Sequence, residues 1–492
     1  MNKKEFYKKA KKYKLDDKYE LAIENYKKGL ELDKYNIDSL KELGEIYEKV
    51  NDINSAIKCY EKIIENESKN SSKQNTIIFL NQIGHCYANN LNYEEALKYF
   101  RKALEFNRVG WPILYNNIGK MYIKLRQYKH AEINLLISLK LQNHSNLFKD
   151  LALTYFCTKK YDKSIDFYMK IPNILQNPPI AHKLSFPYLA NKKFKIGFEL
   201  YENRLKNNPI HPKTGFEERI DIPFLSFWNG LDKCNNLLLC YEQGIGDNFQ
   251  YYRFVIQLSR LHPEMKITYF CRDLIAHIFK DYENINIITE INNLSLYNYK
   301  CYIMSLPYFL KIDKIIPNRE NYIKIDKDKV VYWKEQLDMK NSEKKLNVGF
   351  CYKGHLHSFV EKHIPLQAFE LLVDLNINLI CLHKLSEIEE FNSVSFQDKI
   401  ITFDIDNDMG FIDTIAILQN IDILLTVDTS IVHLAGVLGV KTILMLGYSS
   451  DWRWFDDNEK IWYNSVELLR LHDNVEFKTI LPEVKNIIKN MI

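Results

Sequence analysis

The sequence lacks long apolar runs, close cysteine pairs and blocks of like charge, and each absence excludes a class of protein. No segment approaches the roughly 20 apolar residues of a transmembrane helix, so no membrane span is expected. The nine cysteines are scattered without a Cys-x-x-Cys pair, which argues against a disulfide framework or zinc site and fits a reducing cytoplasm. The formal net charge is only +4, with bases and acids interleaved, so a nucleic-acid-binding protein is not expected.

The start of the chain and its composition are those of a cytoplasmic globular protein. Met1 to Lys9 is charged and no apolar stretch follows, so no secretory signal is expected. Hydrophobic residues make up 46% of the chain and charged residues 26%. We expect a cytoplasmic location, with at most peripheral contact at the inner membrane. A length of 492 residues predicts two or three domains.

A 34-residue period runs through the first two hundred residues. Small and aromatic residues return in one register: Ala10, Tyr13, Ala22, Tyr26 and Gly29; Gly44, Tyr47, Ala56, Tyr60 and Ile63; Gly84, Tyr87, Ala96, Phe100 and Ala103; Gly119, Tyr122, Ala131, Leu135 and Ser138. Weaker copies follow through Ala152, Tyr155, Ser164 and Tyr168, and through Leu189, Gly197 and Tyr201. The pattern predicts helical hairpins in which small residues let two helices approach and aromatic residues fill the gaps between hairpins.

This period and register resemble the tetratricopeptide repeat (TPR) family, and they predict a TPR α-solenoid over residues 1–210. The resemblance implies a concave groove that binds a partner protein or an acceptor. The alternative is a purely structural role, in which the array dimerises or stiffens the protein.

The pattern changes after the repeats. Residues 211–235 contain Pro223, Trp228 and Gly230 and are predicted as a linker. Short apolar strands then alternate with amphipathic helices, at 236–241, 266–271, 285–288, 300–304, 346–352, 377–382, 400–403, 421–427 and 441–446. Strands separated by helices predict parallel sheets. We expect two Rossmann-like lobes, at 236–325 and 326–492, with ligand-binding loops at the carboxyl ends of the strands.

The first candidate loop, from Gly244 to Gln250, follows the first strand. Gly244 and Gly246 permit a tight turn and close approach of the backbone to a substrate. Asp247 is then placed at the start of a helix. It is either a helix cap that accepts a backbone N–H or a general base that faces a cleft.

The second candidate loop lies between a buried strand that ends at Val427 and the next helix. The free N–H groups of such a helix start suit a diphosphate. Asp428, Thr429 and Ser430 either cap the helix or bind ligand hydroxyls. His433 is either a packed helix residue or part of the same site.

Two further loops carry polar or aromatic groups. Lys353 and Gly354 follow a strand, and Lys353 is placed to neutralise a leaving phosphate. His355 and His357 suggest a metal pair, but no third ligand is evident, so no metal site is predicted. The stretch from Asp451 to Trp454 either packs the edge of a lobe or bounds an acceptor site.

Together these stretches resemble bacterial TPR proteins with a C-terminal domain similar to ADP-heptose:lipopolysaccharide heptosyltransferases, glycosyltransferase family nine. The resemblance rests on FELYENR at 198–204, FWNG at 227–230, EQGIGD at 242–247, VGFCYKG at 348–354, IPL at 364–366, FIDT at 411–414, VDTS at 427–430, HLAG at 433–436 and DWRW at 451–454. It covers nearly the whole chain. Relatives usually carry Ser or Ala in place of Lys353, and an Arg-Ser pair in place of Lys362 and His363.

The resemblance implies a GT-B fold and an inverting transfer that needs neither a metal nor a cofactor. A nucleotide sugar would be the donor and a glycan or protein the acceptor. Asp247 matches the residue proposed as general base in that family. Asp428, Thr429 and His433 match its nucleotide-sugar-binding motif, and Lys353 or Lys362 would contact phosphate.

Two other functions remain open at this point. In one, the C-terminal lobes have lost activity and the chain is a TPR interaction scaffold. In the other, the same fold serves a nucleotide-sugar epimerase or hydrolase that uses no acceptor.

Overall fold

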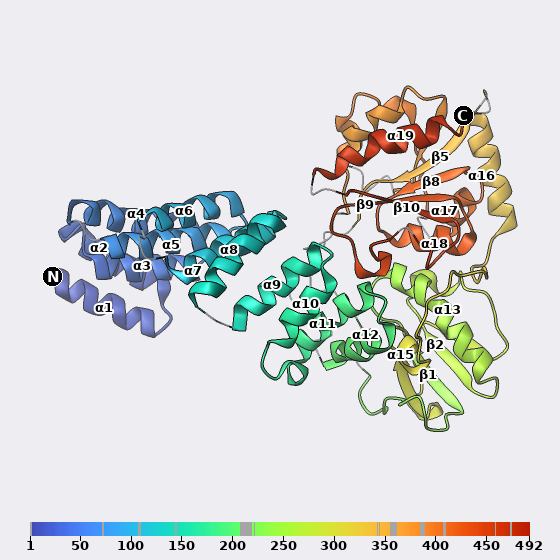
Figure 1. Ribbon diagram of the computed structural model, residues 1–492, viewed down its shortest axis with the longest axis horizontal. Helices are drawn as coiled ribbons and strands as arrows, with labels where there is room; N and C mark the ends of the chain where they lie inside the picture. Colours follow the sequence, from blue (N-terminus) through green and yellow to red (C-terminus); the bar gives the residue numbers. More distant parts are fainter. Residues whose placement is uncertain are drawn as a thin grey trace. The chain divides into compact units, whose positions relative to one another are not determined.

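Antiparallel helix pairs follow the sequence period in the computed structural model. It describes residues 2–70, 73–106, 110–142, 145–206, 219–220, 222–341, 343, 345–354, 362–383, 389–406, 410–457, 459–472 and 475–492. The chain divides into two compact units, Met1–Pro172 and Asn173–Ile492. The first contains α1 (Lys3–Leu15), α2 (Tyr19–Leu32), α3 (Ile37–Lys49), α4 (Ile53–Asn70), α5 (Lys73–Asn89), α6 (Tyr93–Glu105), α7 (Pro112–Lys124), α8 (Tyr128–Leu141), α9 (Ser145–Cys157) and α10 (Tyr161–Met169) (Figure 1).

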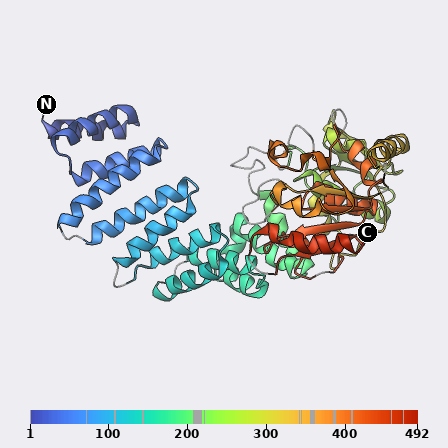
Figure 2. The same ribbon diagram turned by 90° about the horizontal axis from the view of Figure 1, so that it is seen from above.

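The small residues of the repeat lie where two helices of a pair touch. A β-carbon placed on Gly44 of α3 would lie 2.6 Å from the Tyr60 ring of α4, and one on Gly84 of α5 would lie 2.5 Å from the Phe100 ring of α6. Gly119 of α7 meets Leu135 of α8 in the same way, at 2.7 Å. The predicted close approach of paired helices is therefore confirmed, and successive pairs stack along this unit (Figure 2).

The second unit starts with one more helical hairpin, α11 (Pro178–Ala190) and α12 (Phe194–Tyr201), followed by the 3₁₀ helix η2 (Glu202–Lys206). The boundaries predicted at 210, 235 and 325 stay predictions, and much of the stretch 211–235 lies outside the described residues. Among the described helices of the whole chain, none combines the length and apolar character that a membrane crossing needs.

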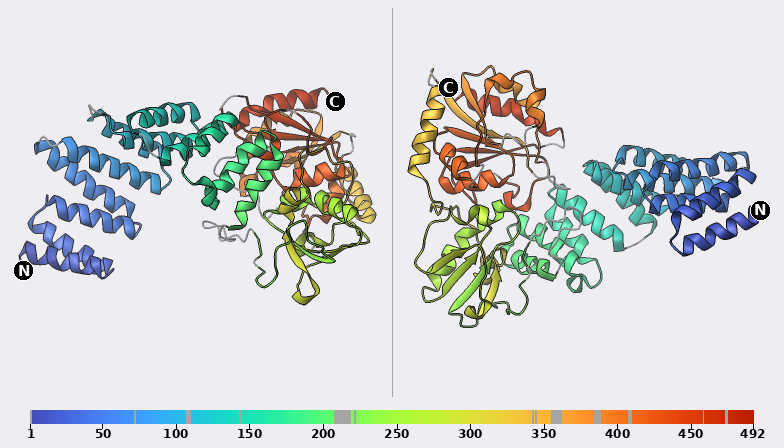
Figure 3. Two further views of the ribbon diagram at one scale, coloured as in Figure 1. Left: turned by 60° about the horizontal axis from the view of Figure 1, so that its bottom comes forward. Right: turned by 180° about the vertical axis from the view of Figure 1, so that it is seen from behind.

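Two parallel sheets follow in the second unit (Figure 3). The first has the order β3-β2-β1-β4 and the second β10-β9-β8-β5-β6-β7. The strands are β1 (Asn236–Cys240), β2 (Lys266–Phe270), β3 (Ile285–Ile288), β4 (Tyr299–Tyr302), β5 (Leu346–Cys351), β6 (Ile377–Cys381), β7 (Ile400–Ile401), β8 (Ile423–Thr426), β9 (Thr442–Leu446) and β10 (Val466–Arg470). Every predicted strand is present and all pairings are parallel, whereas β10 was not predicted.

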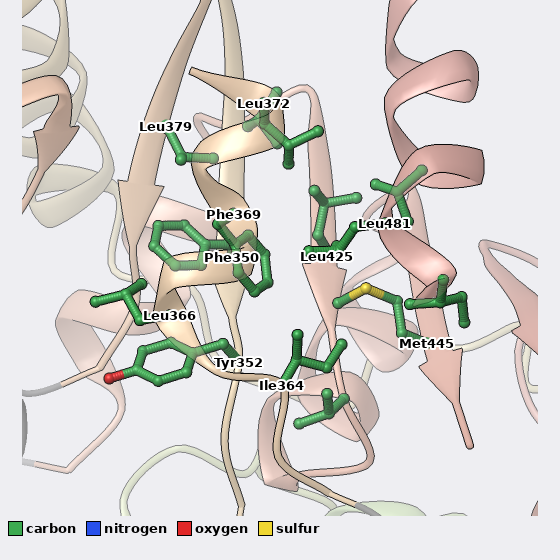
Figure 4. Close-up of a cluster of buried hydrophobic side chains, with 14 of the residues drawn as sticks. Phe350, Tyr352, Ile364, Leu366, Phe369, Leu372, Leu379, Leu425, Met445 and Leu481 are labelled. Carbon is green, nitrogen blue, oxygen red and sulfur yellow. The ribbon is translucent and has the colours of Figure 1, made fainter. Parts of the chain in front are cut away.

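Helices join the strands of both sheets. They include α13 (Ile245–Leu261), α14 (Asp273–Ala276), α15 (Leu306–Phe309), α16 (Lys327–Lys340), α17 (Ile412–Leu418), α18 (Ser430–Leu438) and α19 (Leu481–Lys489). One face of the second sheet packs against the 3₁₀ helix η5 (Leu366–Leu372) and α19 (Figure 4). Phe350 and Leu425 of the sheet, Phe369 of η5 and Leu481 of α19 are fully buried there. This core fixes the positions of the strand ends that carry the candidate loops.

Candidate functional site

The four loops that the sequence singled out meet in the second unit. Residues 244–247 follow β1, 353–354 follow β5, 428–433 follow β8 and 451–454 follow β9. Each loop therefore lies at the carboxyl end of a strand, where parallel α/β sheets bind their ligands. Helix α13 begins in the first of these loops and α18 in the third, and the two helices pack against each other.

Two glycines make this close meeting possible. A β-carbon on Gly246 would lie 3.0 Å from the Cα of Ser430 and 3.0 Å from the Cδ2 of His433. One on Gly354 would lie 3.0 Å from the Cγ2 of Thr429. A β-carbon at either position would be in tighter than ordinary contact, so the neighbouring residues would have to shift by a few tenths of an ångström, which favours glycine at both.

Asp247 is held by both of its carboxylate oxygens. Its Oδ2 accepts a hydrogen bond of 2.9 Å from the N–H of Gly244, the residue that caps α13. Its Oδ1 accepts one of 2.6 Å from Arg453 Nη2. Burial raises the pKa of the Asp247 carboxyl above its ordinary value, and Arg453 and the Gly244 N–H oppose that rise. The group thus both supports the helix start, as one interpretation predicted, and faces the other loops.

A second ion pair joins Lys362 to Asp428. The distance from Nζ to Oδ2 is 2.9 Å, and the Asp428 side chain is 8% exposed. Burial would raise the pKa of the Asp428 carboxyl, but the charge and hydrogen bond of Lys362 oppose this and the pKa is lowered. Lys362 is brought into the site because residues 353 and 363 pair as an antiparallel bridge and the Gly354 N–H donates to the Lys362 carbonyl at 2.7 Å.

His433 is a buried, neutral ring in the same cluster. It stacks on Trp454 with ring centroids 5.4 Å apart, and its Nδ1 lies 3.2 Å from the hydroxyl of Tyr463. Burial lowers the pKa of His433 to about 3. His433 is therefore packed in the core and also lies beside Gly246. It can be both a packed helix residue and part of the candidate site.

The remaining predicted residues lie around these pairs. Thr429 is the N-cap residue of α18, yet its side chain makes no capping hydrogen bond, and Ser430 is the first residue of the helix. Gln250 is fully buried on α13, and neither end of its amide has a hydrogen-bond partner among the described residues. The Nζ of Lys353 lies 5.8 Å from the centroid of the neighbouring Tyr352 ring.

Arg453 is a member of the site that the sequence did not single out. Besides Asp247, it binds Asp451 Oδ1 through Nη1 at 2.9 Å, and its guanidinium lies 5.0 Å from the centroid of the Trp452 ring. Trp452 in turn packs edge-on against Phe198 and Tyr201 of α12. Trp452 and Trp454 therefore pack, as one interpretation predicted, and Arg453 between them contacts Asp247.

A buried ion pair ties α12 and η2 to the loop after β1. Arg204 contacts both carboxylate oxygens of Glu242 at 2.8 Å, and its Nη2 also donates to Ser305 Oγ at 2.8 Å. Arg204 is 2% exposed and Glu242 0%. Both residues belong to stretches that carry the family resemblance, and the structure assigns them a role in anchoring the loop that ends at Asp247.

Metal binding finds no support in the part of the chain that the structure describes. No group of three or more His, Cys, Asp or Glu side chains is placed there to hold an ion. His355 and His357 lie outside the described residues.

Family models match within the repeat region. Two models described as tetratricopeptide repeat match residues 38–70 and 77–108. BBSome complex member BBS4 of Bos taurus is 26% identical to this chain over 123 residues, which are 25% of this chain and 24% of that protein. The chain thus spans about a quarter of the curated relative that it matches. The N-terminal region of the chain therefore contains TPR repeats.

Solved structures give similarities of limited extent. A tetratricopeptide repeat protein from Parabacteroides merdae is 17% identical, with a TM-score of 0.37, over 42% of this chain and 81% of that chain. PilW, a widely conserved type IV pilus biogenesis factor, is 19% identical, with a TM-score of 0.35, over 43% of this chain and 95% of that chain.

Proposed function

We propose that the second unit is a metal-independent, inverting glycosyltransferase of the two-lobed GT-B type, which takes its sugar from a nucleotide sugar. The observation that carries the proposal is the close approach of Gly246, the residue before Asp247, to Ser430 at the start of α18. An acidic residue at the end of one parallel sheet is thereby brought near a helix N-terminus at the end of another. That pairing supplies a base and a phosphate site, the two parts that such a transfer requires.

The start of α18 has the features of a phosphate site. Its first backbone N–H groups have no partner within the helix, and the Thr429 side chain does not cap them. The positive end of the helix contributes about 0.3–1 kcal/mol with an exposed anion and up to about 2 kcal/mol where the anion is partly buried. Lys362, and Lys353 on the adjacent loop, would add positive charge.

The transfer itself would be a single displacement. The Asp247 carboxylate takes the proton from an acceptor hydroxyl, whose oxygen attacks the anomeric carbon from the face opposite the diphosphate. The bond to the diphosphate breaks, and the electron pair leaves on a phosphate oxygen that α18 and Lys362 stabilise. Burial raises the pKa of Asp247, which brings the carboxylate closer to the basicity that proton transfer at neutral pH favours.

The TPR repeats support a protein partner for the array. Arrays of this family commonly present a groove to a peptide or protein, so we assign the acceptor, or a partner that delivers it, to the first unit. The second unit would then bind the nucleotide sugar and carry out the transfer, and the first unit would select the acceptor.

A TPR interaction scaffold with an inactive second unit is the second candidate. It is favoured by the ion pairs of Asp247 with Arg453 and of Asp428 with Lys362, because the groups that would act on a substrate satisfy one another. An epimerase or hydrolase would use the same donor site without an acceptor.

Calorimetry with a panel of nucleotide sugars tests the proposal. We expect the wild type to bind at least one donor and a Thr429→Ala/His433→Ala variant to bind it at least tenfold more weakly, about 1.4 kcal/mol. Arg260→Gln, which breaks only the exposed pair with Glu320, is the matched control and should bind like the wild type. Absence of binding by the wild type to every donor supports the scaffold. Conversion of a donor without acceptor supports the epimerase or hydrolase.

A further inference from the structure

We propose that Arg453 is a latch on Asp247: in this arrangement it pairs with the carboxylate, and an incoming diphosphate draws it away and so frees Asp247. The inference rests on the proposed function and deepens it, since it states how substrate would activate the base. Three observations support it: Arg453 pairs with two carboxylates, one of its donors is unused, and the neighbouring Trp452 packs against α12.

The pairing places one guanidinium between two carboxylates. Arg453 Nη2 lies 2.6 Å from Asp247 Oδ1, and Nη1 lies 2.9 Å from Asp451 Oδ1. Asp451 precedes Arg453 by two residues and accepts from its backbone N–H as well, at 3.0 Å, so this contact lies within one loop. The contact with Asp247 joins different loops and is the one that a competing anion would replace.

Arg453 also retains hydrogen-bonding capacity. Its Nε is buried and has no hydrogen-bond partner among the residues that the structure describes. A guanidinium binds two oxygens of a phosphate or carboxylate in parallel, whereas here only Nη2 contacts Asp247. A phosphate that engaged both Nε and Nη2 would therefore satisfy a donor that the pair with Asp247 leaves unused.

The neighbourhood suits an anion with several oxygens. Gly246 places the start of α13 against Ser430 at the start of α18, so the helix end that would bind phosphate lies beside the residues that flank Asp247. Lys362 is paired with Asp428 in the same cluster. A diphosphate would recruit Arg453 and Lys362 together and release two carboxylates, Asp247 for the acceptor proton and Asp428 for sugar hydroxyls.

The loop that carries Arg453 is held against the helical hairpin by its neighbour. The Arg453 guanidinium lies over Trp452, and Trp452 packs against Phe198 and Tyr201 of α12. With the backbone beside it held in this way, the guanidinium would leave Asp247 by a change of side-chain rotamer.

A double-mutant cycle with inorganic pyrophosphate tests the latch without any transfer assay. Calorimetry on the full-length chain compares the wild type, Arg453→Gln, Asp247→Asn and the double variant. We expect Arg453→Gln to weaken pyrophosphate binding about tenfold and Asp247→Asn to strengthen it several-fold, because the arginine is then unoccupied. In the double variant the gain from Asp247→Asn should vanish.

The cycle distinguishes the latch from plain charge repulsion between the Asp247 carboxylate and pyrophosphate. If Asp247 only repels the anion, Asp247→Asn strengthens binding equally in both backgrounds, and the latch is overturned. It is also overturned if Arg453→Gln binds like the wild type or if no variant binds pyrophosphate. Arg453→Lys should restore part of the affinity, and Arg260→Gln should have no effect. Failure of the transfer assay with a positive cycle would refute the proposed function and leave the latch as an anion-binding device.

Discussion

At the scale of single residues, the second unit depends on charges that are buried with their partners. Arg204 and Glu242 form a bidentate pair that is almost wholly shielded from water. Burial raises the pKa of Glu242, and Arg204 opposes that rise. A charge left alone in such a place costs far more than an exposed one, because neither water nor a counterion can replace the lost partner.

Replacing Arg204 by Met should therefore destabilise the second unit severely. We expect the free energy of unfolding to fall by about 3–5 kcal/mol, measured by urea denaturation with tryptophan fluorescence. The control Arg260→Gln breaks the exposed pair with Glu320 and should change it by less than about 1 kcal/mol. Equal losses in the two variants would contradict the anchoring role of Arg204.

Buried neutral histidines should make the second unit sensitive to acid. Burial lowers the pKa of His383 to about 4, and its Nε2 accepts the Tyr352 N–H at 3.2 Å. Because its pKa is lower in the folded state, the contribution of His383 is complete above the unfolded pKa of about 6.5 and is lost as pH falls toward 4. Between pH 7 and pH 5 this amounts to about 2 kcal/mol for this group.

The variant His383→Gln tests this dependence, since a glutamine oxygen can accept the same N–H. Its free energy of unfolding should fall less steeply from pH 7 to pH 5 than that of the wild type, by up to about 2 kcal/mol. His472→Gln changes an exposed histidine and should leave the slope unaltered. A slope for His383→Gln identical to that of the wild type would refute the assignment.

The residues that the sequence identified are those whose type and position in a loop carry information. Glycines, the acid at a helix start and the DTS stretch after a buried strand were all recognised, and Gly246, Asp247 and Ser430 do lie together. The stretch from Asp451 to Trp454 was singled out as a whole, but the contact of Arg453 with Asp247 was not predicted. That contact joins residues 206 positions apart, and such contacts are not visible in the sequence.

At the scale of elements, each repeat glycine lies where the two helices of a pair touch, against one side chain of the second helix. Gly84→Ala would normally gain about 1 kcal/mol of helix propensity. Here the new methyl group would lie 2.5 Å from the Phe100 ring, so we expect a net loss of about 1–3 kcal/mol. Thermal unfolding followed by circular dichroism measures it.

A compensating change provides the control for that prediction. The equivalent pair in the next repeat is Gly119 with Leu135, which is smaller and more flexible than phenylalanine. Gly84→Ala combined with Phe100→Leu should therefore be more stable than the sum of the two single changes predicts. Strict additivity would show that the two residues do not share one contact.

The central strands of the second sheet were the clearest in the sequence. β8 and β9 are continuous apolar runs buried along their whole length, and such runs are typical of central parallel strands. β10 was not predicted because its run VELLR begins and ends beside charged residues, Glu467 and Arg470, which interrupt the apolar pattern. The order of the strands could not be predicted, because it depends on crossovers that the local sequence does not specify.

At the scale of the whole molecule, the chain combines TPR repeats with a region of two parallel sheets. A protein-binding array beside an enzyme would let acceptor choice change without altering the donor site. The family models that match lie in the repeats, and the proposal for the second unit is argued from its geometry.

The most direct test is mass spectrometry of the products formed when the chain is incubated with nucleotide sugars and a host-cell extract. The account predicts that the wild type adds one sugar to a discrete acceptor, and that Asp247→Asn still binds the donor but transfers at least about 100-fold more slowly. Arg260→Gln should transfer like the wild type. Unimpaired transfer by Asp247→Asn, or no transfer by the wild type with any donor that it binds, would contradict the account.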